Sequence, residues 1–365
     1  MKSIGRQPVR SIKSLRDGGM LIPKERWELG SDFHLSNEKG EFPAPWDALP
    51  HSYWGTGRQA LRGLIKWGRV VHGWRELLIP SYYCQDVIDP LKDEISIRVY
   101  HDAPTFPGSP PITAGREVVV LVVALFGMRP RQLVVGDAAV VEDHTHDPLS
   151  PAAIESPADY AFVGLRKTLP LPDGAVVWSP GGKEVVPERP TTLEHDRAAL
   201  ERLSAMTLKR HYLSGAMVAK SQFRRAAIRG ERMLARGEPS GMSSFSRARL
   251  PTLPGDRWRD ARAANLNAFR SALRRHVNVE LLEAPFAATL VFKSPRVRNR
   301  VRSALIAAKI YPMLLWTLDD RIVAGIPESH IELSRRILSI HCDYRYGATD
   351  MVRVARALGQ VTLSK

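Results

Sequence analysis

The stretch "EVVVLVVALFG", Glu117 to Gly127, contains an uninterrupted apolar run from Val118 to Phe126. The run is far shorter than the roughly 20 residues that span a bilayer, and it is typical of a strand that is buried on both faces. Strands of this kind belong to parallel sheets that are covered by helices on both sides. We therefore expect this stretch to lie at the centre of an α/β domain.

On either side of this stretch, candidate strands alternate with candidate helices. An apolar stripe at helical spacing begins immediately after a Gly-Thr-Gly turn and predicts a helix there, with Ala60, Leu61, Leu64, Ile65 and Trp67 on one face. A second, short helix is predicted over residues 84–93. Further strands are predicted over 76–83, 95–101, 132–143, 158–165 and 174–180. The alternation indicates a mainly parallel sheet between two layers of helices.

The C-terminal part of the chain has a different order of elements. Residues 192–238 read as helices, and residues 237–256 are rich in Gly, Ser and Pro, which marks a domain boundary. A helix (259–276), a strand (287–293), a helix (296–309), an apolar stretch (310–318) and one last helix follow, which is typical of a small α+β domain. We expect an irregular N-terminal segment (1–50), a large domain (51–240) and a small C-terminal domain (241–365).

The net charge of +15 is the unusual feature of the composition. A polyanionic partner or an anionic substrate would explain it. We favour solvated helix faces, because the arginines stand at helical spacing beside Ala and Leu, and no nucleic-acid motif accompanies them. The two cysteines, Cys84 and Cys342, form no metal-binding pattern. No apolar run follows the basic N-terminus, so we expect no signal peptide. The expected compartment is the cytoplasm, with neither a membrane nor a nucleic acid as partner.

Polar residues follow predicted strands or turns in three places, namely "WGTGRQAL" (54–61), "VVEDHTH" (140–146) and "GLRKTLPLPDG" (164–174). Each has an ordinary explanation when it is taken alone: a common glycine turn, a capping acid and a solvated lysine. In open α/β sheets, however, ligands bind outside the carboxyl ends of the strands. The first of these segments, a glycine turn that leads into a helix, also suits the binding of a phosphate group.

In this order, the three places predict an enzyme that uses pyridoxal 5'-phosphate (PLP). Such an enzyme needs a phosphate cradle, a lysine that forms a Schiff base with the cofactor aldehyde, and an ionised acid against the pyridine nitrogen. Lys167 and Asp143 are the candidates for the last two roles. The charge of the acid keeps the ring nitrogen protonated, so that the ring accepts electrons.

The same segments resemble the DegT/DnrJ/EryC1/StrS family of fold-type-I, PLP-dependent aminotransferases, often called sugar aminotransferases. The similarity runs from about Trp54 to the C-terminus. "GTGRQALRGLIKW" resembles the family's Ser-Gly-x-x-Ala-Leu helix start, and "LLIPSYYC" resembles its Pro-Ser/Ala-Tyr/Phe-Thr segment. "VVEDHTH" is similar to its Glu-Asp-Ala-Ala-Gln/His motif, and "FVGLRKTLPLPDGAVV" to the segment that carries the Schiff-base lysine.

The resemblance implies a large PLP-binding domain followed by a small one, and it implies a role for each segment. The implied phosphate ligands are Thr56, Gly57, Arg58 and Gln59. Tyr83, or else Tyr82, would stack on the cofactor ring, because Cys84 stands where the family has its aromatic residue. Asp143 would pair with the ring nitrogen, His146 would lie near the 3-hydroxyl, and Lys167 would hold the cofactor.

Two parts of the family pattern are missing. No serine or threonine stands shortly before Lys167, where one normally touches the phosphate, and Gly164 is nearby instead. The Gly-Tyr-Asn-Tyr-Arg segment, which reaches into the partner subunit's site, is also absent. "AKSQFRRAA" is the nearest stretch, with Arg224 or Arg225 as the residue in that role.

The function expected from the resemblance is transfer of an amino group from L-glutamate or L-glutamine to a keto sugar, often nucleotide-linked, or to a related keto substrate. Lys167 would move the proton. The alternatives are another PLP reaction (dehydration, elimination, racemisation or condensation) and a non-catalytic basic binding protein on the same fold. A homodimer is expected, because the fold-type-I site is normally completed across a two-fold interface.

Four further residues are interpreted as structural. Glu142 precedes Asp143, so strand alternation directs it to the opposite face of the sheet. Trp316 and His341 could reach the mouth of the site from the small domain, but we favour core packing for both. His195 stands in a stretch that reads as the surface of a helix.

Overall fold

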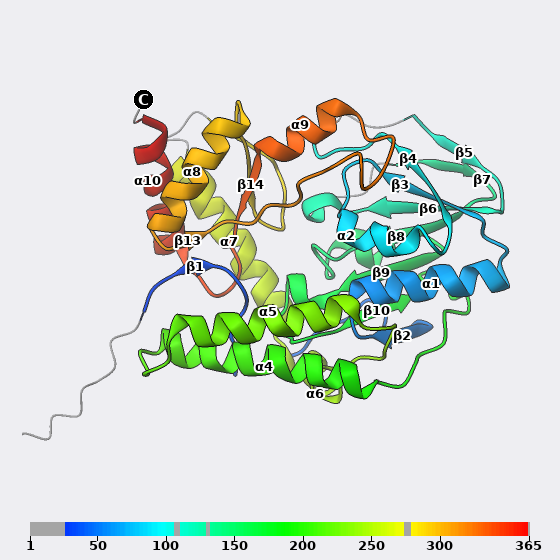
Figure 1. Cartoon of the computed structure of the whole chain (residues 1–365), viewed down its shortest axis with the longest axis horizontal. Coiled ribbons are helices and arrows are strands. Elements are labelled where there is room, and N and C mark those ends of the chain that lie inside the picture. Colours follow the sequence, from blue (N-terminus) through cyan, green and yellow to red (C-terminus); the bar gives the residue numbers. More distant parts are fainter. Residues whose placement is uncertain (1–25, 106–109, 129–131, 274–278, 364–365) are drawn as a thin grey trace, which may run out of the picture.

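The computed structural model describes residues 26–105, 110–128, 132–273 and 279–363. A seven-stranded sheet forms its larger part (Figure 1). The strand order is β2 (His51–Trp54), β10 (Ala175–Trp178), β9 (Tyr160–Gly164), β8 (Ala139–Asp143), β6 (Val118–Val123), β3 (Glu76–Pro80) and β4 (Ser96–Tyr100). Strand β10 runs antiparallel to both of its neighbours, β2 and β9, and all other neighbouring strands pair in parallel. Every residue of β6 is buried, as expected for a sheet covered on both faces.

Helix α1 (Gly57–Val71) packs against β2, β9 and β10. Its buried face includes the apolar residues Ala60, Leu61, Leu64 and Ile65, as the helical spacing predicts. Thr56 caps the helix, because its backbone is extended and its Oγ1 accepts a hydrogen bond from the Gln59 amide at 3.2 Å. The cap fixes where the helix begins, which is at the carboxyl edge of the sheet.

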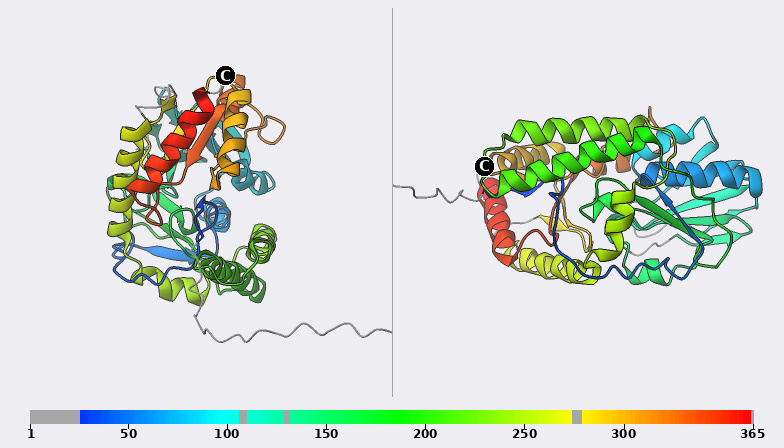
Figure 2. Two further views of the ribbon diagram at one scale, coloured as in Figure 1. Left: turned by 90° about the vertical axis from the view of Figure 1, so that its left-hand side faces the viewer. Right: turned by 90° about the horizontal axis from the view of Figure 1, so that it is seen from below.

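The helices expected over residues 192–238 are α4 (Leu193–Leu213) and α5 (Lys220–Arg236). They pack side by side as an antiparallel pair, which extends from the large sheet toward the C-terminal part of the chain (Figures 1 and 2). Thr192 caps α4 through a bond from the His195 amide to its Oγ1. We call this pair the helical hairpin.

The C-terminal part contains a second, smaller sheet in the order β11 (Glu280–Leu281), β12 (Ala288–Val291) and β14 (Ile337–Ile340), all antiparallel. Helices α7 (Gly255–Leu273), α8 (Pro295–Ala307) and α10 (Ala348–Leu363) pack around it and share its core. Residues 274–276, which end the helix expected over 259–276, lie outside the described residues.

One expectation for this part of the chain is wrong. The prediction of one last helix after residue 318 is replaced by α9 (Glu328–Arg336), β14 and α10. Strand β14 is only four residues long and follows α9 directly, so hydrophobic periodicity does not separate the two. The apolar stretch 310–318 contains only the short strand β13 (Ile310–Tyr311), which pairs with β1 (Leu29–Gly30) from the N-terminal segment.

The Gly/Ser/Pro-rich stretch 237–256 is folded rather than open. It contains α6 (Ser244–Arg249), which Ser243 caps by accepting a hydrogen bond from the Ser246 amide. Met242, Leu250 and Leu253 from this stretch pack with strands β9 and β10 in one core cluster. The division into domains near residue 240 stays a prediction.

The remaining elements are short. They are α2 (Gln85–Ile88), α3 (Pro151–Ile154), β5 (Ile112–Ala114), β7 (Val134–Gly136), and the 3₁₀ turns η1 (Asp89–Leu91), η2 (Leu125–Gly127), η3 (Leu165–Lys167) and η4 (Leu250–Thr252). Strands β5 and β7 form a separate parallel pair. Within the described ranges, no helix combines the length and the apolar character that crossing a membrane requires.

Candidate active site

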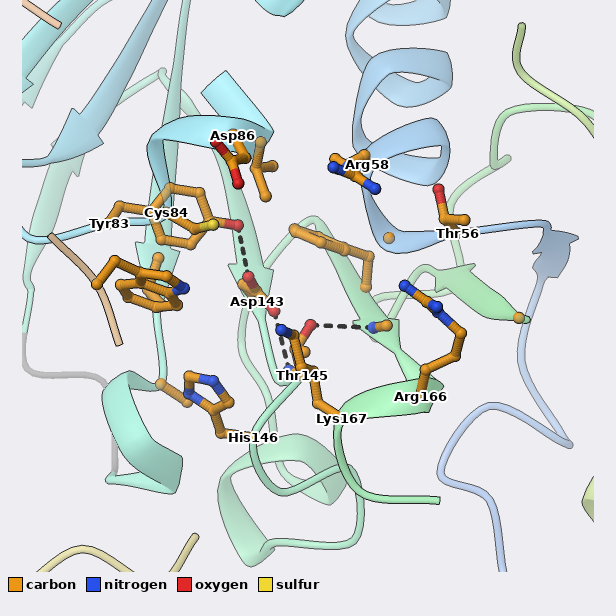
Figure 3. Close-up of a pocket in the computed structure, with 18 of the residues that line it drawn as sticks. Thr56, Arg58, Tyr83, Cys84, Asp86, Asp143, Thr145, His146, Arg166 and Lys167 are labelled. Atoms are coloured by element: carbon orange, nitrogen blue, oxygen red, sulfur yellow. Dashed lines mark hydrogen bonds between the residues drawn. The ribbon is translucent and has the colours of Figure 1, made fainter. Parts of the chain in front are cut away.

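A cavity of about 170 Å³ opens at the carboxyl edge of the large sheet (Figure 3). Its wall is built from the start of α1 and from the segments that follow β3, β6, β8 and β9. Seven of the predicted site residues line it, namely Thr56, Gly57, Arg58, Tyr83, Asp143, His146 and Lys167. The fold therefore brings together three motifs that are far apart in the sequence.

Gln59, the eighth predicted residue, lies outside the cavity wall. Its side-chain amide donates to the Glu238 carbonyl at 2.9 Å, and its backbone amide is used by the Thr56 cap. One residue along a helix turns the side-chain direction by about 100°, so Arg58 and Gln59 face different surroundings. The implied role of Gln59 as a phosphate ligand has no support in this geometry.

The start of α1 offers backbone donors to the cavity. The amides at the first turn of a helix have no partner within the helix, and the helix dipole makes this end positive. Gly57 and Arg58 are the first two residues of α1, and both line the cavity. A Cβ at Gly57 would lie 3.3 Å from the Gly164 Cα, so the two backbones face each other closely across this corner.

Asp143 ends β8 with its carboxylate buried against the cavity. Oδ1 accepts a hydrogen bond from the Thr145 amide at 2.9 Å, and Oδ2 accepts one from the Tyr83 hydroxyl at 2.6 Å. Burial raises the pKa of Asp143 above its ordinary value, although these hydrogen bonds act in the opposite direction. Among the described residues, Asp143 forms no ion pair, so a buried acid faces the cavity without a cation.

Tyr83, but not Tyr82, lines the cavity. Tyr82 is fully buried behind it, and its hydroxyl donates to the Leu315 carbonyl at 2.8 Å. The Tyr83 ring lies edge-on to Trp316, with 5.9 Å between the ring centroids. Cys84 also lines the cavity, and burial raises the pKa of its thiol.

His146 is held as a neutral ring with a defined tautomer. Burial and the nearby Lys167 lower the pKa of His146 to about 3. Nδ1 accepts a hydrogen bond from the Phe126 amide at 3.1 Å, so the proton of the neutral ring is on Nε2. The ring is stacked between Phe286, at 4.4 Å, and Trp316, at 5.7 Å. His146 can therefore donate a hydrogen bond from Nε2 while its orientation stays fixed.

Lys167 follows β9 in the turn η3 and is exposed to the cavity. In the described part of the chain it has no carboxylate within ion-pair distance. The segment after this turn is attached to the residue before the Thr56 cap, because the Gly174 amide donates a hydrogen bond to the Gly55 carbonyl at 2.6 Å. Gly174 has a φ of +119°, which favours glycine, and there the chain turns back into β10.

Sequence reasoning missed a charged cluster beside Lys167. Arg166 donates from both terminal nitrogens to Glu231 of α5, at 2.7 and 3.1 Å, and Arg58 lies 3.3 Å from the same carboxylate. Burial would raise the pKa of Glu231, but the attraction of Arg166, Arg202 and Arg58 outweighs it and holds the pKa well below its ordinary value. The adjacent Arg-Lys pair was a signal in the sequence, whereas nothing in it connects Glu231 with the site.

The structural interpretation of Glu142 is confirmed. Glu142 points away from the cavity, and its Oε2 accepts hydrogen bonds from His144 at 2.9 Å and Ser156 at 2.6 Å. Trp316 packs against the large core cluster, as interpreted, and it also lines the cavity. His341 lines a second recess next to the first.

His195 is buried rather than exposed, so its interpretation as a surface residue is wrong. Its Nε2 lies 2.9 Å from Asp173 Oδ2, which also accepts a hydrogen bond from the Ser243 amide at 2.8 Å. The Ser243 and Ser246 hydroxyls donate to the other oxygen of Asp173. Through these hydrogen bonds Asp173 connects the turn after Lys167 to α4 and α6. The position of this turn is therefore fixed relative to the helical hairpin.

Comparison with known proteins supports the fold. No protein-family model matches this chain, and no curated protein sequence is similar enough to match it. A Streptococcus pneumoniae protein described as a sugar aminotransferase, Spr1654 in its PLP form, is similar in structure with a TM-score of 0.55. The two chains are 10% identical, and the match covers 86% of each.

Two further solved structures have the same arrangement. DesI, solved in the presence of its TDP-sugar product, matches with a TM-score of 0.52 and 14% identity over 86% of this chain and 81% of its own. DesV of S. venezuelae matches with a TM-score of 0.51 and 15% identity over 86% of this chain and 85% of its own. The expected fold class, an α/β fold of the fold-type-I class, is therefore confirmed, and the resemblance to the sugar aminotransferases holds at the level of the fold.

Proposed function

We propose that this chain is a PLP-dependent aminotransferase. The observation that carries the proposal is the single cavity that contains the exposed Lys167, the buried carboxylate of Asp143 and the open start of α1. These three groups match the aldehyde, the ring nitrogen and the phosphate of PLP. The shared fold with the sugar aminotransferases supports the assignment.

The chemistry of the donor set fits the cofactor. A buried carboxylate without a counter-ion, such as Asp143, is stabilised by a protonated ring nitrogen. The Gly57 and Arg58 amides and the guanidinium groups of Arg58 and Arg166 suit a phosphate. Arg166 stands near the position where the family pattern has a serine or threonine, and we propose that it replaces that residue.

When bound, PLP supplies an electron sink for the electrons of the substrate Cα–H bond. Lys167 would hold the cofactor through Nζ and then move the proton between the substrate α-carbon and the cofactor C4′. Asp143 would keep the ring nitrogen protonated, with Tyr83 and the Thr145 amide fixing its carboxylate. His146 would donate from Nε2 to the oxygen at the ring's 3-position.

The proposed amino donor is L-glutamate or L-glutamine, and the proposed acceptor is a keto sugar, nucleotide-linked, or a related keto compound in a biosynthetic pathway. DesI, which shares the fold, was solved with a TDP-sugar product. We further propose a homodimer in the cytoplasm. The symmetric assembly usual for this fold supports the dimer, and two cysteines without a disulfide bond support the compartment.

Borohydride reduction of the purified protein with PLP tests the proposal. The protein should absorb visible light before reduction, and a peptide map should place the reduced cofactor on Lys167. A Lys167→Ala variant should give no adduct, whereas Lys183→Ala, which removes an exposed lysine paired with Asp159, should be labelled normally. L-Glutamate should convert the unreduced cofactor to its amine form. An adduct on Lys183, or none, would contradict the proposal.

A further inference from the structure

A second recess, of about 500 Å³, lies beside the candidate active site. The two cavities share Arg166, Lys167 and Glu231 in their walls, so a molecule in the recess can reach the Lys167 amine. Side chains from the N-terminal segment, the helical hairpin and the C-terminal part line the recess. The recess therefore leads outward from the proposed reaction centre.

Helix α5 presents one face to this recess. The four residues of the helix that line it are Arg224, Ala227, Ile228 and Glu231. Their spacing of three and four residues places them on one stripe. Glu231 stands at the inner end, against Arg166, and Arg224 stands seven residues away, about 10 Å along the helix axis.

The recess has an excess of positive charge. Its ionised lining residues are Arg166, Lys167, Arg202 and Arg224 against Asp32 and Glu231, so four positive and two negative charges leave +2. Both acids are already paired, since Arg202 lies 3.2 Å from Asp32 and Arg166 lies 2.7 Å from Glu231. Within the described residues, Arg224 is exposed and has no carboxylate within ion-pair distance.

Much of the remaining wall is apolar or aromatic. Phe33, Met206, Phe286, Tyr311 and Met313 contribute to it. His341 adds a further ring, and burial lowers its pKa. A ligand in this recess thus meets an apolar wall on one side and the uncommitted guanidinium of Arg224 at the outer end of the stripe.

We propose that Arg224 anchors a phosphate group of the amino acceptor, distant from its keto carbon, and that it acts in the same chain whose Lys167 reacts. This inference rests on the proposed function. Arg224 stands about 10 Å along the helix axis from Glu231, which contacts Arg166 beside the reacting lysine. This position suits an anion at the far end of a long acceptor rather than the second carboxylate of the short amino donor. Glu231, the hairpin residue at the inner end of the stripe, contacts Arg58 and Arg166 of its own chain, which places the stripe beside the Lys167 of that chain.

Arg225 gives a matched control for Arg224. It is the next residue of the same helix and is also exposed, but it does not line the recess. Binding of inorganic pyrophosphate to the PLP-loaded protein is measured by calorimetry for wild type, Arg224→Gln and Arg225→Gln. Loss of one charge-assisted contact should raise the Kd at least about tenfold in Arg224→Gln. The Arg225→Gln variant should bind as wild type does.

The donor reaction separates this role from a general loss of structure. The rate at which L-glutamate converts the cofactor should be the same in Arg224→Gln and wild type. Wild type that fails to bind pyrophosphate at millimolar concentrations, or Arg224→Gln that binds it equally well, would overturn the inference. Absence of a Lys167 adduct would instead refute the proposed function, because the pyrophosphate titration uses protein in which the cofactor already fills its own phosphate site.

Mixed dimers test whether the arginine acts within one chain. In a purified heterodimer of Lys167→Ala and Arg224→Gln chains, only the second chain holds the cofactor covalently. If Arg224 acts in its own chain, pyrophosphate should perturb the cofactor absorbance only weakly, as in the Arg224→Gln homodimer. A response as tight as in wild type would mean that the arginine comes from the partner chain.

Discussion

The Tyr83 hydroxyl donates a hydrogen bond to Oδ2 of Asp143 over 2.6 Å, and both side chains are buried. Because the Thr145 amide binds the other oxygen, the carboxylate is held at both of its atoms. A carboxylate has about four acceptor sites, and the hydrogen bonds from Tyr83 and from the amide and side chain of Thr145 leave at least one of them for a ligand. Tyr83 therefore fixes the direction in which Asp143 faces the cavity, while the negative charge of Asp143 remains available.

Replacing Asp143 by Asn should lower turnover by orders of magnitude. The substitution keeps the shape of the side chain but removes the charge that would hold the ring nitrogen protonated. Breaking a buried charge pair typically costs about 3–5 kcal/mol, and each ~1.4 kcal/mol added to a barrier slows a reaction tenfold. The rate of the L-glutamate half-reaction measures the effect, and PLP binding should change less.

Glu142→Gln is the matched control for Asp143→Asn. Glu142 lies on the opposite face and bonds to His144 and Ser156, so the substitution should leave the half-reaction nearly unchanged even if the protein melts at a lower temperature. Equal rates in wild type and Asp143→Asn would show that Asp143 only terminates the strand.

Replacing Glu231 by Gln should strengthen the binding of inorganic phosphate to the cofactor-free protein several-fold. The carboxylate occupies both terminal nitrogens of Arg166 and one of Arg58, and it would repel a phosphate at the start of α1. Calorimetric titration with phosphate measures the change. Glu201→Gln, which removes an exposed pair with Arg229, should have no effect.

The same substitution should destabilise the cofactor-free protein, because Arg166 and Arg58 lose their partner. The side chain of Glu231 is 42% exposed, so we expect about 1–2 kcal/mol rather than the roughly 3–5 kcal/mol of a fully buried pair. Weaker phosphate binding in Glu231→Gln would instead mean that the carboxylate orients the arginines toward the phosphate.

Replacing His146 by Gln should make the free energy of unfolding decrease less steeply as the pH is lowered. The folded-state pKa is about 3 and the ordinary value is 6.5, so between these values the unfolded chain binds one more proton than the folded chain. The contribution of His146 to the free energy of unfolding is therefore fully present above about pH 6.5. It falls by about 1.4 kcal/mol for each pH unit below that value, until the pH reaches the folded-state pKa. The variant lacks this contribution at every pH.

Urea unfolding of the cofactor-free protein at several pH values between 4 and 7 measures how steeply the free energy of unfolding depends on pH in wild type and in His146→Gln. Only the difference between wild type and His146→Gln matters, because the other titrating groups contribute to both. Parallel slopes would contradict the burial of a neutral His146.

Sedimentation at micromolar concentration should show a homodimer with two equivalent PLP sites. The reason is the symmetric two-fold assembly that proteins of this fold commonly form. The same runs on protein with and without PLP test whether assembly depends on the cofactor. A monomer that still binds a full equivalent of PLP would contradict the expected dimer.

The sequence by itself determined the type of fold and most of the reactive groups. The apolar run at Val118 to Phe126, the stripe of α1 and the strands before Asp143 and Lys167 are local patterns, and local periodicity predicts such elements well. Because strands in a parallel sheet end at one edge, the sequence also indicated that Asp143 and Lys167 would meet.

Only the tertiary structure decided which other side chains complete the site. Glu231 reaches Arg166 across 65 residues, Trp316 reaches His146 from the C-terminal part, and Arg224 faces the recess while Arg225 does not. These contacts depend on how the helical hairpin and the C-terminal part pack against the sheet edge. Helical periodicity identifies the faces of a helix, but it does not say which neighbour each face will meet, since that is fixed by contacts between segments far apart in the chain.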